Sequence, residues 1–211
     1  MSAARTIDPA RRSARDVYAL MISAIVPRPI ALVSTTDGHG GYNLAPFSYF
    51  MGVSSAPPVV AISLVKRRQG EKKDTLRNVE ATGELVVNVV DETMAAAMNL
   101  AAADAPYGYD EFALAGLTPL PGERVAAPRV AESPVQMECR LERIVEVGAQ
   151  PAYLVLSEVV LFHVREDVLA GERIDPLRLR PLGRLGGSDY ARIGEVFSMP
   201  RPAFDAAGER R

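Results

Sequence analysis

The 211-residue chain contains one cysteine, two histidines and no tryptophan. Its single thiol, Cys139, cannot form an intrachain disulfide, which is typical of proteins from a reducing compartment. Two histidines and one cysteine are also too few for an ordinary zinc site. These absences predict a cytoplasmic protein with no metal centre.

The chain also lacks a strong excess of either charge and a long apolar run. It has 24 lysines and arginines against 26 aspartates and glutamates, for a net charge of −2. That balance argues against a nucleic-acid-binding protein. No apolar stretch approaches the ~20 residues of a membrane-spanning helix. Residues 1–15 contain arginines but no apolar segment, so we expect neither a membrane anchor nor a secretory signal.

Several motifs of catalysis and nucleotide binding are absent. The chain has no G-x-G-x-x-G, no G-x-x-x-x-G-K-[ST] and no G-x-S-x-G, which argues against Rossmann, P-loop and serine-hydrolase mechanisms. His39 lies in a glycine-rich turn and His163 among apolar residues, so neither is expected to act in catalysis. The apolar setting of Cys139 predicts a buried, inert thiol. We therefore predict no catalytic side chain.

Hydrophobic periodicity predicts more strands than helices. Helical spacing covers residues 10–24 and ends before Pro27. Asp74 or Thr75 is expected to cap a second helix that ends at Gly83, and 93–103 is expected to be a third. The predicted strands cover 30–36, a hairpin partner from 42, 59–65, 85–90, 136–141 and 153–164.

These strands are mostly connected as hairpins, which favours a closed or nearly closed antiparallel barrel. Clean alternation over 136–141 predicts a half-buried strand, with Gln136, Glu138 and Arg140 on one face. No linker or internal repeat divides the chain. We expect residues 1–211 to form one domain with its core at about 18–190, and the termini to form extended arms.

Two groups of polar residues could bind an anion. Ser48, Lys73, Thr75 and the amides near Asp74 combine hydroxyls, a cation and a helix start, which are the donors that a phosphate needs. Composition alone favours a solvated loop at 66–73 with Asp74 as a helix cap. Arg184 and Tyr190 could bind an anion or a ring, or could tie down a C-terminal arm.

A third polar group lies where two neighbouring strands are expected to end or bend. Ser34, Thr35, Asn43 and Ala45 could contact the polar edge of a flat ring. Each of them, taken singly, is more often an ordinary strand or turn residue. The residues alone leave this choice open.

Six blocks together resemble the flavin reductase-like family of FMN-binding split barrels. In chain order they are PRPIALVSTTDGHGGYNLAPFSYF, SSAPPVVAISL, KKDTLRN, LVVNVV, YDEFALAGLTP and RLGGSDY. The likeness covers roughly residues 18–190. It implies a mainly β fold: an antiparallel split β-barrel of Greek-key type with peripheral helices.

The resemblance also implies a homodimer that binds FMN at or near the subunit interface. The segments matching the flavin ring contacts are Ser34 to Thr36 and Asn43 to Ala45. The segments matching the phosphate and ribityl contacts are Ser48 to Phe50 and the loop Lys73 to Thr75. Arg184 and Tyr190 match a C-terminal motif that, in such proteins, approaches the flavin or the partner subunit. The implied cofactor-binding residues are Ser34, Thr35, Thr36, Asn43, Leu44, Ala45, Ser48, Tyr49, Phe50, Lys73, Asp74, Thr75, Arg184 and Tyr190.

One block and one loop stand outside this assignment. Asp110, Glu111 and Phe112 match a family block of less clear role, either a structural support or a flap. The loop 66–71 is richer in cations than the family pattern, which leaves several candidate phosphate contacts.

The implied activity is that of an FMN-dependent oxidoreductase reduced by NADH or NADPH, with an electron-acceptor protein or a monooxygenase component as partner. The alternatives are an FMN-binding electron carrier without pyridine-nucleotide activity, and a non-catalytic barrel whose flavin site has decayed. A relative of pyridoxamine-phosphate oxidase would share the barrel, but PRPIALVST and NLAPFSYF point away from it.

Overall fold

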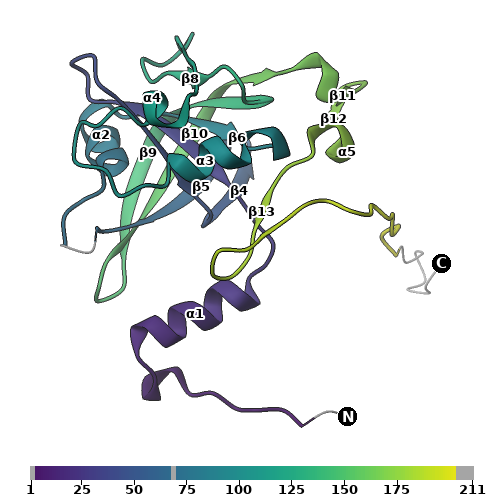
Figure 1. Ribbon diagram of the computed structural model, residues 1–211. Coiled ribbons are helices and arrows are strands. Elements are labelled where there is room, and N and C mark those ends of the chain that lie inside the picture. Colours follow the sequence, from purple (N-terminus) through teal and green to yellow (C-terminus); the bar gives the residue numbers. More distant parts are fainter. Residues whose placement is uncertain (1–2, 68–69, 203–211) are drawn as a thin grey trace.

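A seven-stranded antiparallel sheet curls into a barrel at the centre of the computed structural model, which describes residues 3–67 and 70–202 (Figure 1). The strands follow the order β3-β2-β6-β9-β10-β5-β4. Their bounds are β2 Ala31–Thr36, β3 Tyr42–Phe47, β4 Phe50–Ser55, β5 Pro58–Val65, β6 Glu84–Val89, β9 Val135–Val147 and β10 Ala152–Val164. The two end strands, β3 and β4, follow each other in the chain through Ser48 and Tyr49. Within the described residues no ladder joins them, so the barrel is split, as the sequence predicted.

Both faces of β2 are buried, because its alternate side chains enter two different cores. Ala31 and Val33 point into the barrel, where they pack with residues such as Leu76 and Val87. Leu32 belongs to a second cluster outside the barrel, which includes Leu44, Met98 and Phe112. The strand therefore holds the barrel and its outer helices in one arrangement.

Helix α2, Asp74–Thr82, packs Leu76 and Val79 into the barrel core. It ends at Gly83, whose φ of 70° is the left-handed conformation that glycine adopts readily. The sequence correctly predicted this helix and its end, but the cap prediction was wrong. Lys73 is the N-cap residue, and it makes no side-chain cap. The Asp74 carboxylate binds Arg67 instead of the helix amides.

The second core lies under short helices on the outside of the sheet. The predicted helix at 93–103 forms as η2, Glu92–Met94, and α3, Ala95–Leu100, and α4 covers Glu111–Ala115. The remaining elements are η1 Pro9–Arg11, β1 Arg28–Pro29, β7 Pro119–Leu120, β8 Arg129–Val130, η3 Glu166–Val168, β11 Leu169–Ala170, β12 Arg173–Ile174, α5 Pro176–Leu179, β13 Gly183–Arg184 and β14 Tyr190–Ala191. None of the helices in the described ranges has the length and apolar character needed to cross a membrane.

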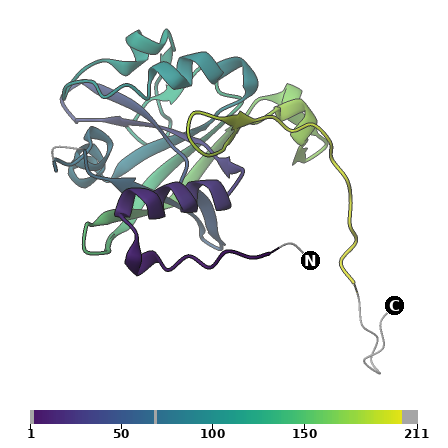
Figure 2. The ribbon, with the colours of Figure 1, turned by 60° about the horizontal axis from the view of Figure 1, so that its bottom comes forward.

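Helix α1, Ala14–Ala24, stands away from the barrel (Figure 1). Ser13 caps it by accepting from the Asp16 amide at 3.1 Å, and the helix has no buried residue. The chain after β14 also runs away from the barrel, toward the C-terminus (Figure 2). The predicted arm at 203–211 lies outside the described residues, whereas α1 agrees with the helix predicted at 10–24.

The prediction of a half-buried strand at 136–141 is confirmed for Arg140, which is exposed, but was wrong for Gln136 and Glu138. Glu138 has 0% exposure and Gln136 is also buried. The loop between β7 and β9 covers this face. Backbone amides of Glu123, Arg124 and Val125 donate to the Glu138 carboxylate at 2.6–3.1 Å, and His163 Nε2 lies 2.6 Å from it. Alternation correctly predicted the strand but could not show that a distant loop supplies partners for its carboxylate.

Candidate functional site

A cavity of about 750 Å³ opens beside the start of α2, a volume typical of small-molecule sites. Segments that are far apart in the sequence meet there. The lining includes Asn43 and Ala45 from β3, Lys73, Asp74 and Thr75 from the start of α2, Glu111 from α4, and Arg184 from β13. Six of these seven residues were predicted from the sequence, Glu111 being the exception. Within the described part of the chain no cluster of three or more His, Cys, Asp or Glu side chains could hold a metal ion.

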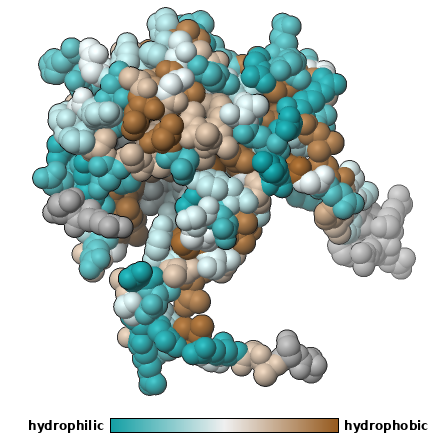
Figure 3. Space-filling model, viewed as in Figure 1, coloured by the Kyte–Doolittle hydropathy of each residue, from teal (hydrophilic) through white to brown (hydrophobic). Residues whose placement is uncertain are grey.

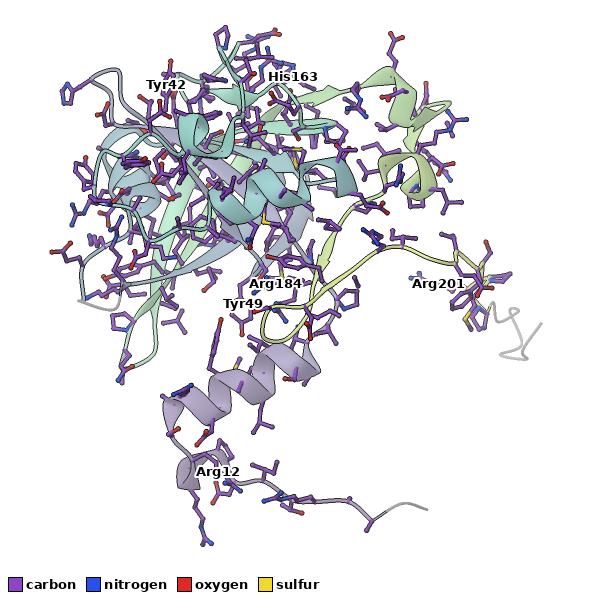
Figure 4. All side chains as sticks on the ribbon, viewed as in Figure 1. Arg12, Tyr42, Tyr49, His163, Arg184 and Arg201 are labelled. Atoms are coloured by element: carbon purple, nitrogen blue, oxygen red, sulfur yellow. The ribbon has the colours of Figure 1, made fainter. Side chains whose placement is uncertain are left out.

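A second cavity of about 230 Å³ adjoins the first. The two share Tyr18, Pro46, Ala102 and Arg184 as lining residues, and the smaller cavity adds Ser48 and Tyr190. The Arg184 guanidinium lies over the Tyr190 ring, 4.4 Å from its centroid. Figure 4 shows Arg184 and Tyr49 between α1 and the barrel, far from Tyr42 and His163. Ser48 and Thr75 therefore line two adjoining cavities.

One end of the larger cavity is cationic. Arg67 binds Asp74 at 3.0 Å and lies 3.7 Å from Asp104, so its charge is neutralised within the protein. Burial raises the pKa of Asp74, although Arg67 opposes this effect. Lys73, in contrast, forms no ion pair with any described residue. Burial lowers the pKa of its ammonium group, which lies 5.3 Å from the Phe47 ring centroid.

The first amides of α2 have no side-chain cap, because Asp74 turns away to Arg67. A helix N-terminus of this kind carries partial positive charge and unused N–H donors. Lys73 and these amides supply a cation and main-chain donors at this end of the cavity, which is the chemistry that an anion requires, and the Thr75 hydroxyl lies in the same lining.

A hydrogen-bond network fixes the polar wall next to this end. Asn43 Nδ2 donates to Thr75 Oγ1 at 2.9 Å and to Thr35 Oγ1 at 3.4 Å. Asn78 Nδ2 also donates to Thr35 Oγ1, at 3.0 Å. Thr35 is fully buried and lies behind the wall. The network holds β2, β3 and α2 in a fixed relation around the cavity.

Other residues predicted to contact a ligand have side chains outside the two cavities. Ser34 is buried, donates to the carbonyl of Pro128, and accepts from Asn88 Nδ2 at 3.0 Å. Thr36 Oγ1 donates to the Gly41 carbonyl at 3.0 Å in the β2–β3 turn, and Leu44 belongs to the outer core.

The two residues at the start of β4 also lie apart from the cavities. Tyr49 is half-buried and lies beneath the Arg28 guanidinium, 5.8 Å from ring centroid to Cζ. Phe50 lines a separate apolar groove of about 380 Å³.

Arg28 is a structural residue that the sequence analysis missed. Its side chain is 4% exposed and donates to the carbonyls of Ile22 and Ile25 at 2.7 Å, that of Leu185 at 2.8 Å, and Ser48 Oγ at 3.3 Å. One guanidinium therefore ties the end of α1 and the C-terminal segment to the cavity edge. The only signal in the sequence is an arginine between two prolines in a region otherwise rich in strand residues.

Glu111 is the second missed residue. It is only 5% exposed, lines the larger cavity, and accepts from the Leu44 amide through Oε2 at 3.2 Å. Burial raises the pKa of its carboxyl, and the nearby carboxylates of Asp74 and Asp110 raise it further. No described cation forms an ion pair with it. The YDEFALAGLTP block contained this residue but gave no indication of its position.

Comparison with known proteins shows which family the chain belongs to. The model of the flavin reductase like domain matches residues 22–181. A protein of Halalkalibacterium halodurans is 38% identical over 202 residues, covering 94% of this chain and 97% of its own length.

Two solved structures extend the likeness. Nitrilotriacetate monooxygenase component B from Bacillus cereus is 39% identical, with a TM-score of 0.91, over 94% of this chain and 100% of that one. The 2-nitrobenzoate 2-nitroreductase NbaA of Pseudomonas fluorescens is 30% identical, with a TM-score of 0.84, over 95% and 98%. The chain belongs to the flavin reductase-like family, and its function is a flavin-related oxidoreduction.

Proposed function

We propose that the protein is an FMN-dependent oxidoreductase that takes electrons from NADH or NADPH and passes them to a second acceptor. The observation that carries the proposal is the joining of three features in one cavity: the ammonium of Lys73, which has no ion pair among the described residues, the uncapped start of α2, and the polar wall of β3. A bound flavin would supply the hydride and electron transfer chemistry, and the protein would supply position and electrostatics.

The cationic end of the cavity suits a terminal phosphate. Such a group carries roughly two negative charges near neutral pH and accepts hydrogen bonds through three oxygens. Lys73 and the amides at Asp74 offer a cation and main-chain donors in a compact arrangement, and the Thr75 hydroxyl is left for another part of the ligand. This arrangement favours FMN, whose phosphate is terminal, over FAD. Arg184, Ser48 and Tyr190 would bind the ligand from the adjoining cavity.

The remaining predicted residues fall into two roles in this proposal. Asn43 and Ala45 would contact the ring directly, because they line the cavity. The second role is support: these side chains pack behind or beside the cavities and do not line either of them. The supporting residues are Ser34, Thr35, Thr36, Leu44, Tyr49 and Phe50.

A monooxygenase component is our proposed electron acceptor, because the Bacillus cereus protein of the same fold is a monooxygenase component B. We also propose a homodimer in the cytoplasm. Tyr18, Leu20, Met21 and Ile25 of α1 and its end are 43–54% exposed, and Figure 3 shows uncovered apolar side chains on this helix. A second copy of the chain would cover them.

An absorbance spectrum followed by anaerobic addition of NADH tests the proposal. We expect a yellow protein, or one that binds added FMN more tightly than FAD, and bleaching when NADH or NADPH is added. A yellow protein that neither nucleotide bleaches would support the electron-carrier alternative. A protein that binds neither flavin would contradict both functions.

A further inference from the structure

Glu111 is a buried carboxyl that faces the cavity and is not needed for the phosphate. A carboxylate repels a phosphate, so Glu111 must face another part of any ligand that Lys73 and α2 hold. One of its oxygens, Oε2, is used by the Leu44 amide. Its own backbone amide is the other donor to the carboxyl, and no further described residue donates to it. A carboxylate left in this state is costly unless a donor completes its hydrogen bonds.

The neighbouring Thr75 presents the opposite chemistry. Its Oγ1 accepts from Asn43 Nδ2 at 2.9 Å, which leaves the hydroxyl proton free to donate. Thr75 and Glu111 line the same cavity. The wall therefore offers both a donor and an acceptor to a ligand.

An oxidised flavin ring has one N–H group, the imide at N3, and carbonyl oxygens on either side of it. This edge alternates acceptor, donor and acceptor, and Thr75 and Glu111 complement one of the acceptors and the donor. Resting on the function proposed above, we propose that Glu111 is a specificity-determining residue whose carboxylate accepts a hydrogen bond from the flavin imide N–H. The hydrogen bond from the Leu44 amide of β3 fixes the position of the carboxylate.

The pKa of Glu111 is consistent with this role. Burial raises it in the protein alone, whereas a donor from the ligand would stabilise the charged form and lower it again. The groups that face the carboxyl are the Leu44 amide from β3 and its own backbone amide, which lower the pKa, and the carboxylates of Asp74 and Asp110, which raise it. None of them is a cation, so the ligand would supply the missing favourable interaction.

The test is a comparison of FMN with N3-methyl FMN, in which a methyl group replaces the imide proton. Binding is measured by quenching of flavin fluorescence in the wild type, in Glu111→Gln and Glu111→Leu, and in the exposed control Glu158→Gln. We expect methylation to weaken binding by about tenfold or more in the wild type and the control. In Glu111→Leu the two ligands should bind alike, and Glu111→Gln, which keeps a neutral acceptor, should lie between.

Each protein is its own reference, so a general loss of affinity from a disturbed β3 does not affect the comparison. An equal methylation penalty in the wild type and both Glu111 variants would overturn the inference, even if FMN binds tightly. If wild-type protein binds no flavin at all, the function proposed above fails first. Lumiflavin, which has no ribityl chain or phosphate, should show the same dependence on Glu111; independence would assign the carboxylate to a ribityl hydroxyl instead.

Discussion

At the scale of single residues, two adjacent lysines differ in a way that the sequence does not reveal. Lys73 is half-buried in the cavity and lacks an ion-pair partner among the described residues. Lys72 binds Glu80 at 2.6 Å and lines neither cavity. The pair offers a matched test of the phosphate site.

Replacing Lys73 with methionine should weaken FMN binding by about 10- to 100-fold, because a charged hydrogen bond to phosphate contributes about 1.5–3 kcal/mol. Lys72→Met should change it by less than about threefold. Isothermal titration with FMN measures both, and lumiflavin serves as the control ligand because it has no phosphate. Equal losses in the two variants would contradict the assignment of Lys73.

Glu111 also predicts a pH-dependent effect on stability. Because burial raises its pKa in the folded state, the wild-type protein gives up stability as pH rises through that pKa. Glu111→Gln should therefore raise the melting temperature of flavin-free protein near pH 7.5 by about 2 °C.

The advantage of Glu111→Gln should shrink as pH falls toward about 4.3, the pKa of an ordinary glutamate. Thermal unfolding at several pH values measures this, with Glu158→Gln as a control that should show no such trend. A stabilisation that stays constant with pH would mean that the charge of Glu111 is not its cause.

At the scale of elements, Arg28 holds together pieces that have few other contacts. It joins the end of α1, the Ser48 corner between β3 and β4, and the carbonyl of Leu185. Lysine could not replace it, because an ammonium group lacks the planar fork that makes these bonds at once.

Arg28→Met should lower the free energy of unfolding by about 3 kcal/mol, since buried carbonyls lose a charged donor. The expected fall in melting temperature is about 6–12 °C. Limited proteolysis should also cut sooner between α1 and β2. The control is Arg143→Met, an exposed arginine that pairs only with its neighbour Glu142. Unchanged proteolysis in Arg28→Met would show that α1 is held by other contacts.

At the scale of the whole molecule, the exposed apolar face of α1 predicts self-association. Leu20→Asp combined with Met21→Asp should convert a dimer to a monomer in sedimentation experiments, because each charge would enter a buried interface. Phe162→Asp is the control. It is an exposed apolar residue that precedes His163 in β10, and His163 lies at the opposite end of the molecule from α1 (Figure 4). A wild-type monomer at micromolar concentration would contradict the dimer.

Sequence patterns predicted six of the seven barrel strands, the helix ending at Gly83, and the residues of β3 and α2 that meet in the cavity, but did not separate β4 from β3. These features depend on local periodicity, turn chemistry and the order of family blocks. The partners of buried polar groups could not be predicted in the same way. Glu138 is satisfied by a loop more than ten residues away, and Asp74 by an arginine on the preceding loop. Burial of Arg28 and Glu111 likewise depends on segments that only the folded chain brings together.

The one thiol of this protein can report how often the barrel opens. Cys139 has no exposed surface, lies in the barrel core, and has its pKa raised by burial to about 12. A thiol reagent can therefore reach it only when β9 separates from its neighbours. The rate of alkylation in native buffer reports how often that separation occurs, and the measurement needs no mutation. Slower alkylation with added flavin would register ligand binding from a strand that the ligand never touches.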